Sequence, residues 1–164
     1  MPTPLDPLTF GPDQRCFGCG PHNHVGMGLQ FQRDGDEVVT TFHGKPGWEG
    51  PPGILHGGLQ ATLADEIGAW TLVGLLGRFG FTTSAQLKWL RPAKLDLPIE
   101  ARGRIVERKG NVVTVKVGLR QDGHLVLSGA VTYALVTVAQ AERILGQPLP
   151  EAWHHLAEPA QGQG

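Results

Sequence analysis

A histidine, two glycines and an aspartate stand close together in this 164-residue chain and carry groups that could do chemistry. His56, Gly57 and Gly58 follow a Pro-Pro-Gly break, and Asp65 comes nine residues after the histidine. A helix that begins at the glycines would point unpaired N–H groups at an oxyanion or carbonyl oxygen, and glycine lets a substrate approach closely. A desolvated carboxylate two to three turns later could act as a base or nucleophile. Hydrolysis of an activated acyl group needs both functions.

The element that must position these groups is a helix over residues 57 to about 76. One face of this helix carries small residues around Asp65, so the helix can lie very close to a sheet or to another chain. We therefore expect the carboxylate to lie in a tight, partly dry place, and Glu66, a quarter-turn away, to be a surface or inter-subunit acid. Apolar residues recur at steps of three and four and share one helix face: Leu59, Leu63, Ile67 and Trp70.

Alternating apolar and polar residues predict strands on both sides of this helix. A hairpin over residues 28–43 turns at Asp34-Gly35, and the chain turns again at Lys109-Gly110-Asn111 and at Asp122-Gly123. Clean alternation indicates an antiparallel sheet with one buried face. The fold class is therefore α+β, with one long helix covered by a curved antiparallel sheet of five to six strands. Four strand-like runs follow the helix, at residues 81–90, 97–108, 112–120 and 124–138.

The run G-x-x-H-G-G, with an acid nine residues after its histidine, resembles the hotdog-fold acyl-CoA thioesterases of the PaaI-like (4HBT) superfamily. Residues 82–93, TTSAQLKWLRPA, resemble the strand that follows the helix of that family, and the likeness covers roughly residues 28–138. The resemblance implies the hotdog fold and hydrolysis of an acyl-CoA thioester to free acid and CoA. It also implies a homodimer or homotetramer in which Asp65 of one chain meets the glycine pair of another.

The resemblance also assigns roles to residues. The backbone N–H of Gly57 would hold the thioester carbonyl, and His56 would orient the thioester or fix the loop. Asp65 would activate water as a general base or attack directly to give an anhydride. Thr82 would position the acid or the water, with Thr83 in its place if the register slips. The residues expected to contact substrate, including cations that could meet the phosphates of CoA, are Gly58, Thr83, Lys88, Arg91 and Lys94.

The chain divides into an N-terminal arm over residues 1–27, a hotdog domain over 28–138, and a C-terminal helix and tail over 139–164 whose Gln/Gly-rich end we expect to be mobile. The arm contains the only two cysteines, Cys16 and Cys19, with His22 and His24 just after them. These four side chains could hold zinc. The alternatives are that the cysteines pack under a Gly-Pro turn or form a redox pair. The expected reaction itself requires no cofactor.

Charge and hydropathy exclude several classes of protein. Fourteen basic and fifteen acidic residues give a net charge of -1, which provides no electrostatic footprint for nucleic acid or a polybasic membrane contact. No apolar run is long enough to span a bilayer, and residues 1–20 do not resemble a signal peptide. We therefore expect a cytoplasmic protein.

Three other functions fit the same residues: a hotdog dehydratase using His56 and Asp65, a non-catalytic acyl-thioester binding protein, and a zinc-stabilised scaffold. The acyl group stays open between aryl and medium-chain types. Aromatic residues that could shape an aryl pocket, or could equally fill the core, are Trp48, Trp70, Phe79, Phe81 and Trp89.

Overall fold

The computed structural model describes residues 1–157 of the chain, so the Gln/Gly-rich tail at 158–164 lies outside the described residues. No helix in the described part is long and apolar enough to cross a membrane. The strands are β1 (Thr3–Pro4), β2 (Gln32–Asp34), β3 (Glu37–Phe42), β4 (Gly80–Trp89), β5 (Ile99–Lys109), β6 (Val112–Gln121) and β7 (His124–Leu135). The helices are α1 (Gly57–Leu76), α2 (Val138–Leu145) and α3 (His154–Ala157), with a 3-10 turn, η1 (Glu151–Trp153), before α3.

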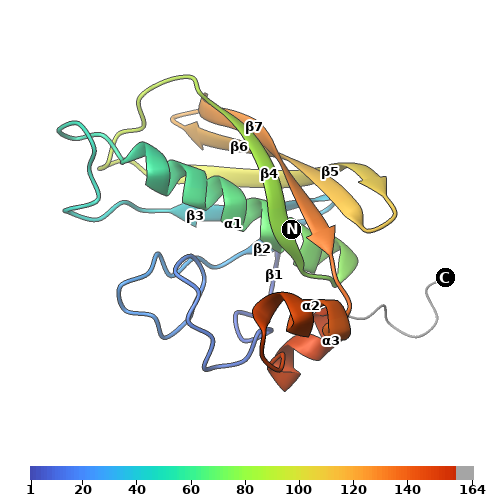
Figure 1. The fold of residues 1–164 in the computed structure, drawn as a ribbon. Helices are drawn as coiled ribbons and strands as arrows, with labels where there is room; N and C mark the ends of the chain where they lie inside the picture. The colour runs from blue at the N-terminus through green and yellow to red at the C-terminus, as the bar shows by residue number, and fades with distance from the viewer. Residues whose placement is uncertain (158–164) are drawn as a thin grey trace.

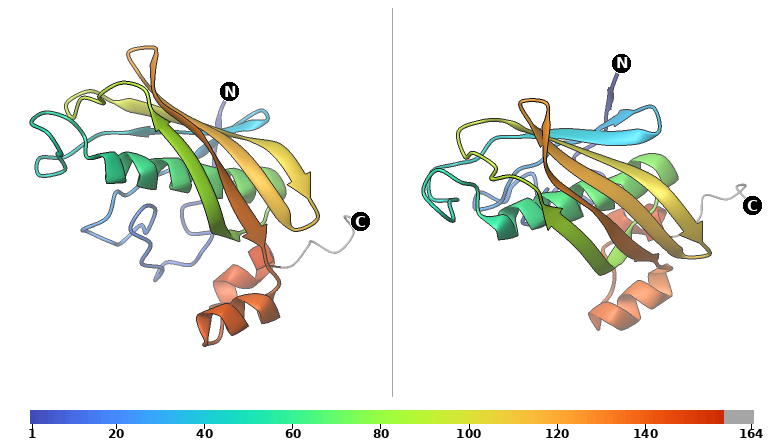
Figure 2. Two further views of the ribbon diagram at one scale, coloured as in Figure 1. Left: turned by 45° about the horizontal axis from the view of Figure 1, so that its top comes forward. Right: turned by 90° about the horizontal axis from the view of Figure 1, so that it is seen from above.

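All strands join one antiparallel sheet in the order β1-β2-β3-β5-β6-β7-β4. The sheet curves over α1, as Figures 1 and 2 show. It contains seven strands rather than the predicted five to six, because Thr3–Pro4 of the N-terminal arm pairs with β2. The α+β class and the long central helix are confirmed.

Short turns join the central strands where the sequence predicts them. Gly110, with φ 61°, lies between β5 and β6. Asp122 and Gly123, with φ 48° and 74°, form the two-residue connection of β6 to β7. Positive φ at both positions matches the twist of antiparallel neighbours, which explains the Asp-Gly pair there.

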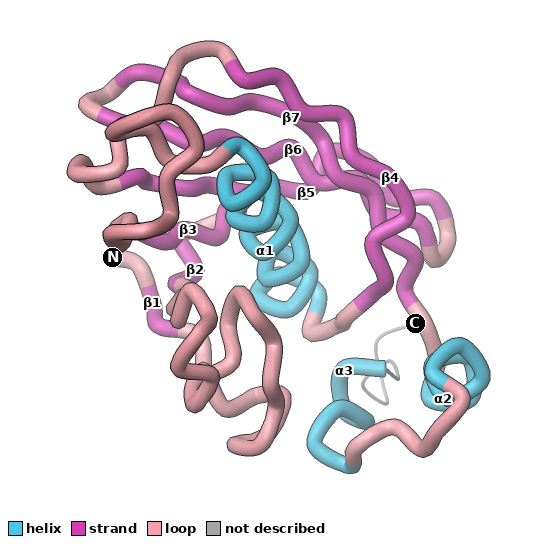
Figure 3. Tube along the Cα trace, turned by 60° about the vertical axis from the view of Figure 1, so that its left-hand side comes forward, coloured by secondary structure: helices cyan, strands magenta, loops and turns pink. Residues whose placement is uncertain are grey.

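Helix α1 lies between the sheet and the N-terminal arm (Figure 3). Leu63 and Ile67 are fully buried, as the apolar period predicts. Trp70 is also buried, but it stacks on Phe31 at 4.8 Å between ring centroids and meets the edge of Phe10 from the arm. A helix that is covered on more than one side must be apolar over more than one stripe.

The small residues of α1 allow the sheet to approach the helix backbone. A Cβ atom at Gly68 would overlap the hydroxyl of Tyr133 on β7, and one at Gly103 on β5 would overlap Thr71. The predicted close contact between the helix and the sheet is therefore present on the side of α1 that carries Asp65.

The C-terminal segment lies against the connection between α1 and β4. Helix α2 begins with a capping box between Thr137 and Gln140 and ends at Gly146, which adopts a left-handed conformation. The guanidinium of Arg78 donates hydrogen bonds to the carbonyls of Val136 and Ala157, at 3.1 Å each. These bonds hold α3 close to the start of β4.

Candidate active site

The carboxylate of Asp65 is held by two hydroxyl groups from neighbouring strands. Thr82 on β4 donates a hydrogen bond to Oδ1 at 2.8 Å, and Tyr133 on β7 donates to the same atom at 3.2 Å. Thr82 and Tyr133 are paired across these strands, so both side chains reach the same face of the sheet. Within residues 1–157 no group donates a hydrogen bond to Oδ2. The second oxygen is thus free to accept a proton or to attack an electrophile.

Tyr133 is a functional candidate that the sequence reasoning missed. Its hydroxyl also donates to the backbone carbonyl of Asp65, at 2.8 Å. Burial first, and then the negative charge of Asp65, raises the pKa of Tyr133 well above its ordinary value, so the hydroxyl stays protonated and remains a donor. It is the only tyrosine of the chain, and the OH of a buried tyrosine needs a partner, which is the one signal that could have suggested it.

The start of α1 leaves one backbone donor available. His56 is the N-cap residue, and its Nδ1 accepts a hydrogen bond from the N–H of Gly58 at 2.9 Å. Accepting at Nδ1 places the proton of a neutral imidazole on Nε2. The N–H of Gly57 donates no hydrogen bond to any group within residues 1–157. Of the two glycines, Gly57 therefore presents a free donor, whereas the N–H of Gly58 is already bonded.

The register of β4 distinguishes Thr82 from Thr83. A bulge lies between Thr82 and Ser84, and the hydroxyl of Thr83 donates to the carbonyl of Thr132 at 3.1 Å. Thr83 therefore serves the sheet and does not bond to the acid.

The three expected cations are exposed and border the loop that precedes α1. Leu55, one residue before the N-cap, donates its N–H to the carbonyl of Ala93 at 2.8 Å, and Ile54 forms a bridge with Lys94. Arg91 and Lys94 belong to this connection, and Lys88 lies near the end of β4.

A cavity of about 440 Å³ opens beside Asp65. Its walls come from α1, β4, the N-terminal arm and the C-terminal segment, and most of its lining is apolar. Five aromatic residues from these elements contribute to the lining: Phe10, Trp70, Phe79, Phe81 and Trp153. A larger cavity of about 560 Å³ lies beside β1 and β2, but neither Asp65 nor the glycine pair lines it. The cavity at Asp65 is therefore the candidate site.

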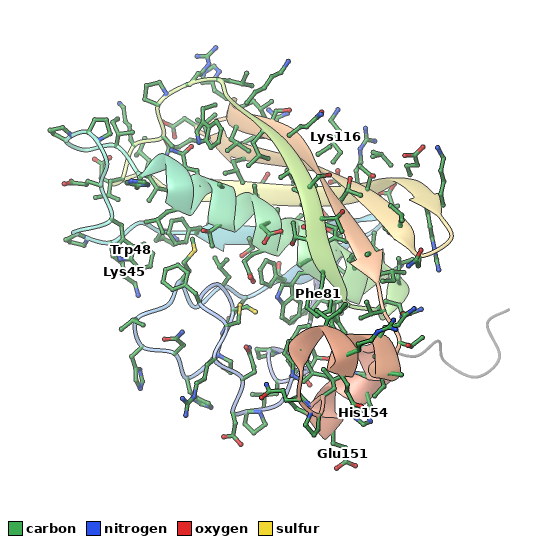
Figure 4. The ribbon with its side chains drawn as sticks, viewed as in Figure 1. Lys45, Trp48, Phe81, Lys116, Glu151 and His154 are labelled. Atoms are coloured by element: carbon green, nitrogen blue, oxygen red, sulfur yellow. The ribbon has the colours of Figure 1, made fainter. Side chains whose placement is uncertain are left out.

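Only part of the predicted aromatic set lines this cavity. Trp70, Phe79 and Phe81 do so, but Trp48 stacks on Phe42 at 5.8 Å between ring centroids. Figure 4 shows Trp48 beside Lys45 in the loop before α1, well apart from Phe81 near the C-terminal helices. Trp89 is half exposed and lies next to Gly57 instead. The aromatic walls contributed by the two termini, Phe10 and Trp153, were not predicted.

The cysteines of the arm meet an acid rather than the nearby histidines. In the described part of the chain, one group of potential metal ligands comprises Cys16, Cys19 and Glu66, whose ligand atoms all lie within 4.8 Å of one another. His22 and His24 are exposed and lie outside this group. The turn that follows Cys19 directs both histidines to solvent. Glu66, expected to be a surface or inter-subunit acid, is not a surface acid, because its Oε2 atom is buried within the chain.

One α1 helix does not bring Asp65 and Gly57 together. Eight residues separate them, which at 1.5 Å per residue is about 12 Å along the helix axis. A single reacting carbonyl group cannot contact both. The structure thus brings Asp65, Thr82 and Tyr133 together in one chain and leaves His56 and Gly57 at a separate end.

The fold matches solved structures that include several proteins named as thioesterases. A thioesterase superfamily protein has a TM-score of 0.68 and 24% identity, over 80% of this chain and 66% of that one. A hypothetical thioesterase protein from Streptococcus pneumoniae TIGR4, solved with coenzyme A, has a TM-score of 0.60 and 23% identity, over 65% and 86%. A phenylacetic acid degradation-related protein from Ralstonia eutropha JMP134 has a TM-score of 0.60 and 25% identity, over 66% and 85%. A search of curated proteins finds no match.

Residues 52–128, which contain the glycine pair, Asp65 and Thr82, match the family model described as the thioesterase superfamily. The predicted resemblance to this superfamily is confirmed over these residues. The class of enzyme that this family model supports is a thioester hydrolase.

Proposed function

We propose that this protein hydrolyses an acyl-CoA thioester to the free acid and CoA, with Asp65 as the catalytic carboxylate. The observation that carries the proposal is the pair of hydroxyl donors on Oδ1 of Asp65, at the wall of an apolar cavity. Two donors on one oxygen fix the orientation of the carboxylate and leave Oδ2 to react. Oδ2 either removes a proton from water that attacks the thioester or attacks the carbonyl carbon itself, giving an anhydride that water then hydrolyses.

The N–H of Gly57 stabilises the oxyanion that forms on the thioester carbonyl. A backbone donor at a helix N-terminus combines a fixed direction with the positive end of the helix dipole. Because Gly57 is about 12 Å along the axis from Asp65 of the same chain, the donor at each site comes from a second copy. His56 holds Gly58 and so keeps the first turn in place.

The edge of the sheet offers a surface for that second copy. β4 is the last strand and has only β7 beside it. Five consecutive residues of β4, from Thr82 to Gln86, are exposed, and Trp89 and Leu90 that follow are each 50% exposed. A long edge strand with exposed apolar residues is a liability unless something pairs with it. Two copies joined through β4 would extend the sheet and bring their α1 helices together. Either a dimer or a tetramer of such dimers fits this arrangement.

The substrate spans two regions of the site. Lys88, Arg91 and Lys94 border the glycine end of α1 and could meet the phosphates of CoA as charge-assisted partners. The Streptococcus pneumoniae structure, solved with coenzyme A, supports a CoA substrate for this fold. The aromatic cavity beside Asp65 takes the acyl group. Its volume of about 440 Å³ lies within the range of about 300–1,000 Å³ that is usual for small-molecule sites, and its lining suits an aryl or medium-chain acyl group.

The first experiment compares the wild type with Asp65→Asn on a panel of aryl, short-chain and medium-chain acyl-CoA thioesters, following thiol release. Asp96→Asn, which alters an exposed acid on the connection after β4, is the matched control. We expect hydrolysis by the wild type and the control, and a loss of several orders of magnitude in Asp65→Asn with the oligomer intact by light scattering. Activity in Asp65→Asn equal to that of the wild type would show that another group is catalytic. No hydrolysis by any form, with retained acyl-CoA binding, would favour the binding-protein alternative.

A further inference from the structure

The N-terminal arm and α1 enclose a compact set of acidic side chains. Cys16 and Cys19 come from the arm, and Glu66 comes from α1, one residue after Asp65. The Sγ atom of Cys16 lies 3.2 Å from Oε1 of Glu66, and the three ligand atoms all lie within 4.8 Å of one another.

Hydrogen bonds from neighbouring residues fix the turn that carries the two cysteines. The N–H of Gly20 donates to the carbonyl of Cys16 at 2.9 Å, which closes the C-x-x-C turn. Gln14 accepts from the N–H of Cys16 and donates to the carbonyl of Cys19, at 2.9 and 3.1 Å. A Cβ atom at Gly18 would overlap the side chain of Glu66, so glycine at this position admits the carboxylate between the two cysteines. The close approach of Glu66 to the turn therefore requires glycine at position 18.

The carboxylate of Glu66 is enclosed beside the two thiols. The Oε2 atom of Glu66 is buried and has no partner among the described residues. A buried oxygen without a partner is costly, and a bound cation would satisfy it.

We propose that Cys16, Cys19 and Glu66 form a binding site for Zn²⁺ or a similar thiophilic divalent ion. Two thiolates and one carboxylate form a donor set that suits zinc. A tetrahedral zinc with Zn–S of about 2.3 Å and Zn–O of about 2.1 Å sets sulfur and oxygen about 3.6 Å apart, and two sulfurs about 3.8 Å apart. The observed distance of 3.2 Å between Sγ of Cys16 and Oε1 of Glu66 is about 0.4 Å shorter than the value for a shared zinc, a difference that side-chain rotation can supply.

Three protein ligands leave one coordination position of a tetrahedral ion open. All three ligands line the cavity that Asp65 also lines, so the open position is reached from that cavity. The ion would link the N-terminal arm to α1 at the residue next to the catalytic acid. This inference does not depend on the proposed hydrolysis, because it concerns metal binding and a metal-binding measurement tests it.

The experiment uses the full chain, reduced and treated with a chelator, and adds Co²⁺ as a spectroscopic probe and Zn²⁺ as a competitor. We expect about one metal per chain, a thiolate-to-cobalt charge-transfer band, and loss of that band when Zn²⁺ is added. Cys16→Ser and Cys19→Ser should abolish the band. Glu66→Gln, which keeps the size of the side chain, should weaken cobalt binding by about tenfold or more, as expected for the loss of an anionic ligand.

The matched control is the double variant His22→Ala/His24→Ala, which removes the exposed imidazoles of the arm and should bind cobalt as the wild type does. Loss of the band in this control, with no effect of Glu66→Gln, would overturn the assignment of Glu66. Absence of any charge-transfer band in the reduced wild type, whose fold is verified by circular dichroism, would overturn the metal site itself and leave the cysteines as a packing or redox pair.

Discussion

Replacing Gly57 by proline tests the oxyanion donor without removing the helix that presents it. Proline at the first helical position lacks the N–H group, yet that N–H has no intrahelical partner in any case. The residue before a proline must be extended, and His56 already has φ -54° and ψ 132°. A Cβ at position 57 meets the Trp89 ring only at an ordinary contact distance of 3.5 Å. The substitution thus fits the backbone and deletes one donor.

The expected loss follows from the value of one oxyanion donor. Removing such a donor typically lowers kcat by about 100- to 1,000-fold, or about 3–4 kcal/mol of transition-state stabilisation. Gly57→Ala keeps the N–H and is the matched control. We expect Gly57→Ala to retain most of the activity on the best acyl-CoA of the panel, and Gly57→Pro to lose about two to three orders of magnitude in kcat, with both variants equally helical by circular dichroism.

The same variant tests whether each site is shared between two chains. A chain with Gly57→Pro and a chain with Asp65→Asn are each inactive in this scheme. In a mixed dimer, however, one site combines Asp65 of the first chain with Gly57 of the second. Random pairing makes half of the dimers mixed with one intact site of two, so co-expression should restore about one quarter of wild-type activity. No restoration in mixed dimers, or a Gly57→Pro variant as active as Gly57→Ala, would refute this reasoning.

Three further variants address the groups around the site. Thr82→Val removes a hydrogen bond to the catalytic carboxylate, worth about 1.5–3 kcal/mol for a charged acceptor, so kcat should fall by about 10- to 100-fold with KM little changed. Thr82→Ser should recover most of the rate and Thr83→Val should leave it unaltered; equal effects at both threonines would contradict the positioning role. Gly68→Ala places a methyl group against the Tyr133 hydroxyl and should destabilise the fold by about 1–3 kcal/mol in a urea titration, whereas an unchanged midpoint would show that the contact is loose. His56→Ala should cost about 0.5–2 kcal/mol of stability through the lost cap and His56→Asn should restore it; if His56→Asn recovers stability but not hydrolysis, the imidazole acts on substrate as well.

Much of the fold was predictable from local patterns. Apolar residues that recur at steps of three and four predicted a helix over residues 57 to about 76, and α1 spans Gly57–Leu76. Period-two alternation and glycine-containing turns predicted the strands from β4 to β7, because each pattern reports on neighbouring residues of the same element. The extra strand β1 was not predictable: two exposed residues carry no alternation, and only their pairing with β2 makes them a strand.

The sequence by itself also determined the outline of the site. The glycine pair at the helix start and the helical period predicted Asp65 on the small face of α1. The resemblance of residues 82–93 to the strand of the hotdog family implied that Thr82 positions the acid or the water, and a 2.8 Å hydrogen bond joins Thr82 to Asp65. The helical period alone placed the acid, whereas the choice between Thr82 and Thr83 depended on the bulge in β4, which only the structure shows.

Only the tertiary structure decided which distant groups complete the site. Tyr133 reaches Asp65 across 68 residues of chain, and Cys16 reaches Glu66 across 50. Which aromatic residues line the cavity depended likewise on how the N-terminal arm and the C-terminal segment close over α1. No local pattern encodes such contacts, because they depend on how separate elements pack. The need for glycine at positions 68 and 18 is explained only by the side chain that each admits in the folded chain.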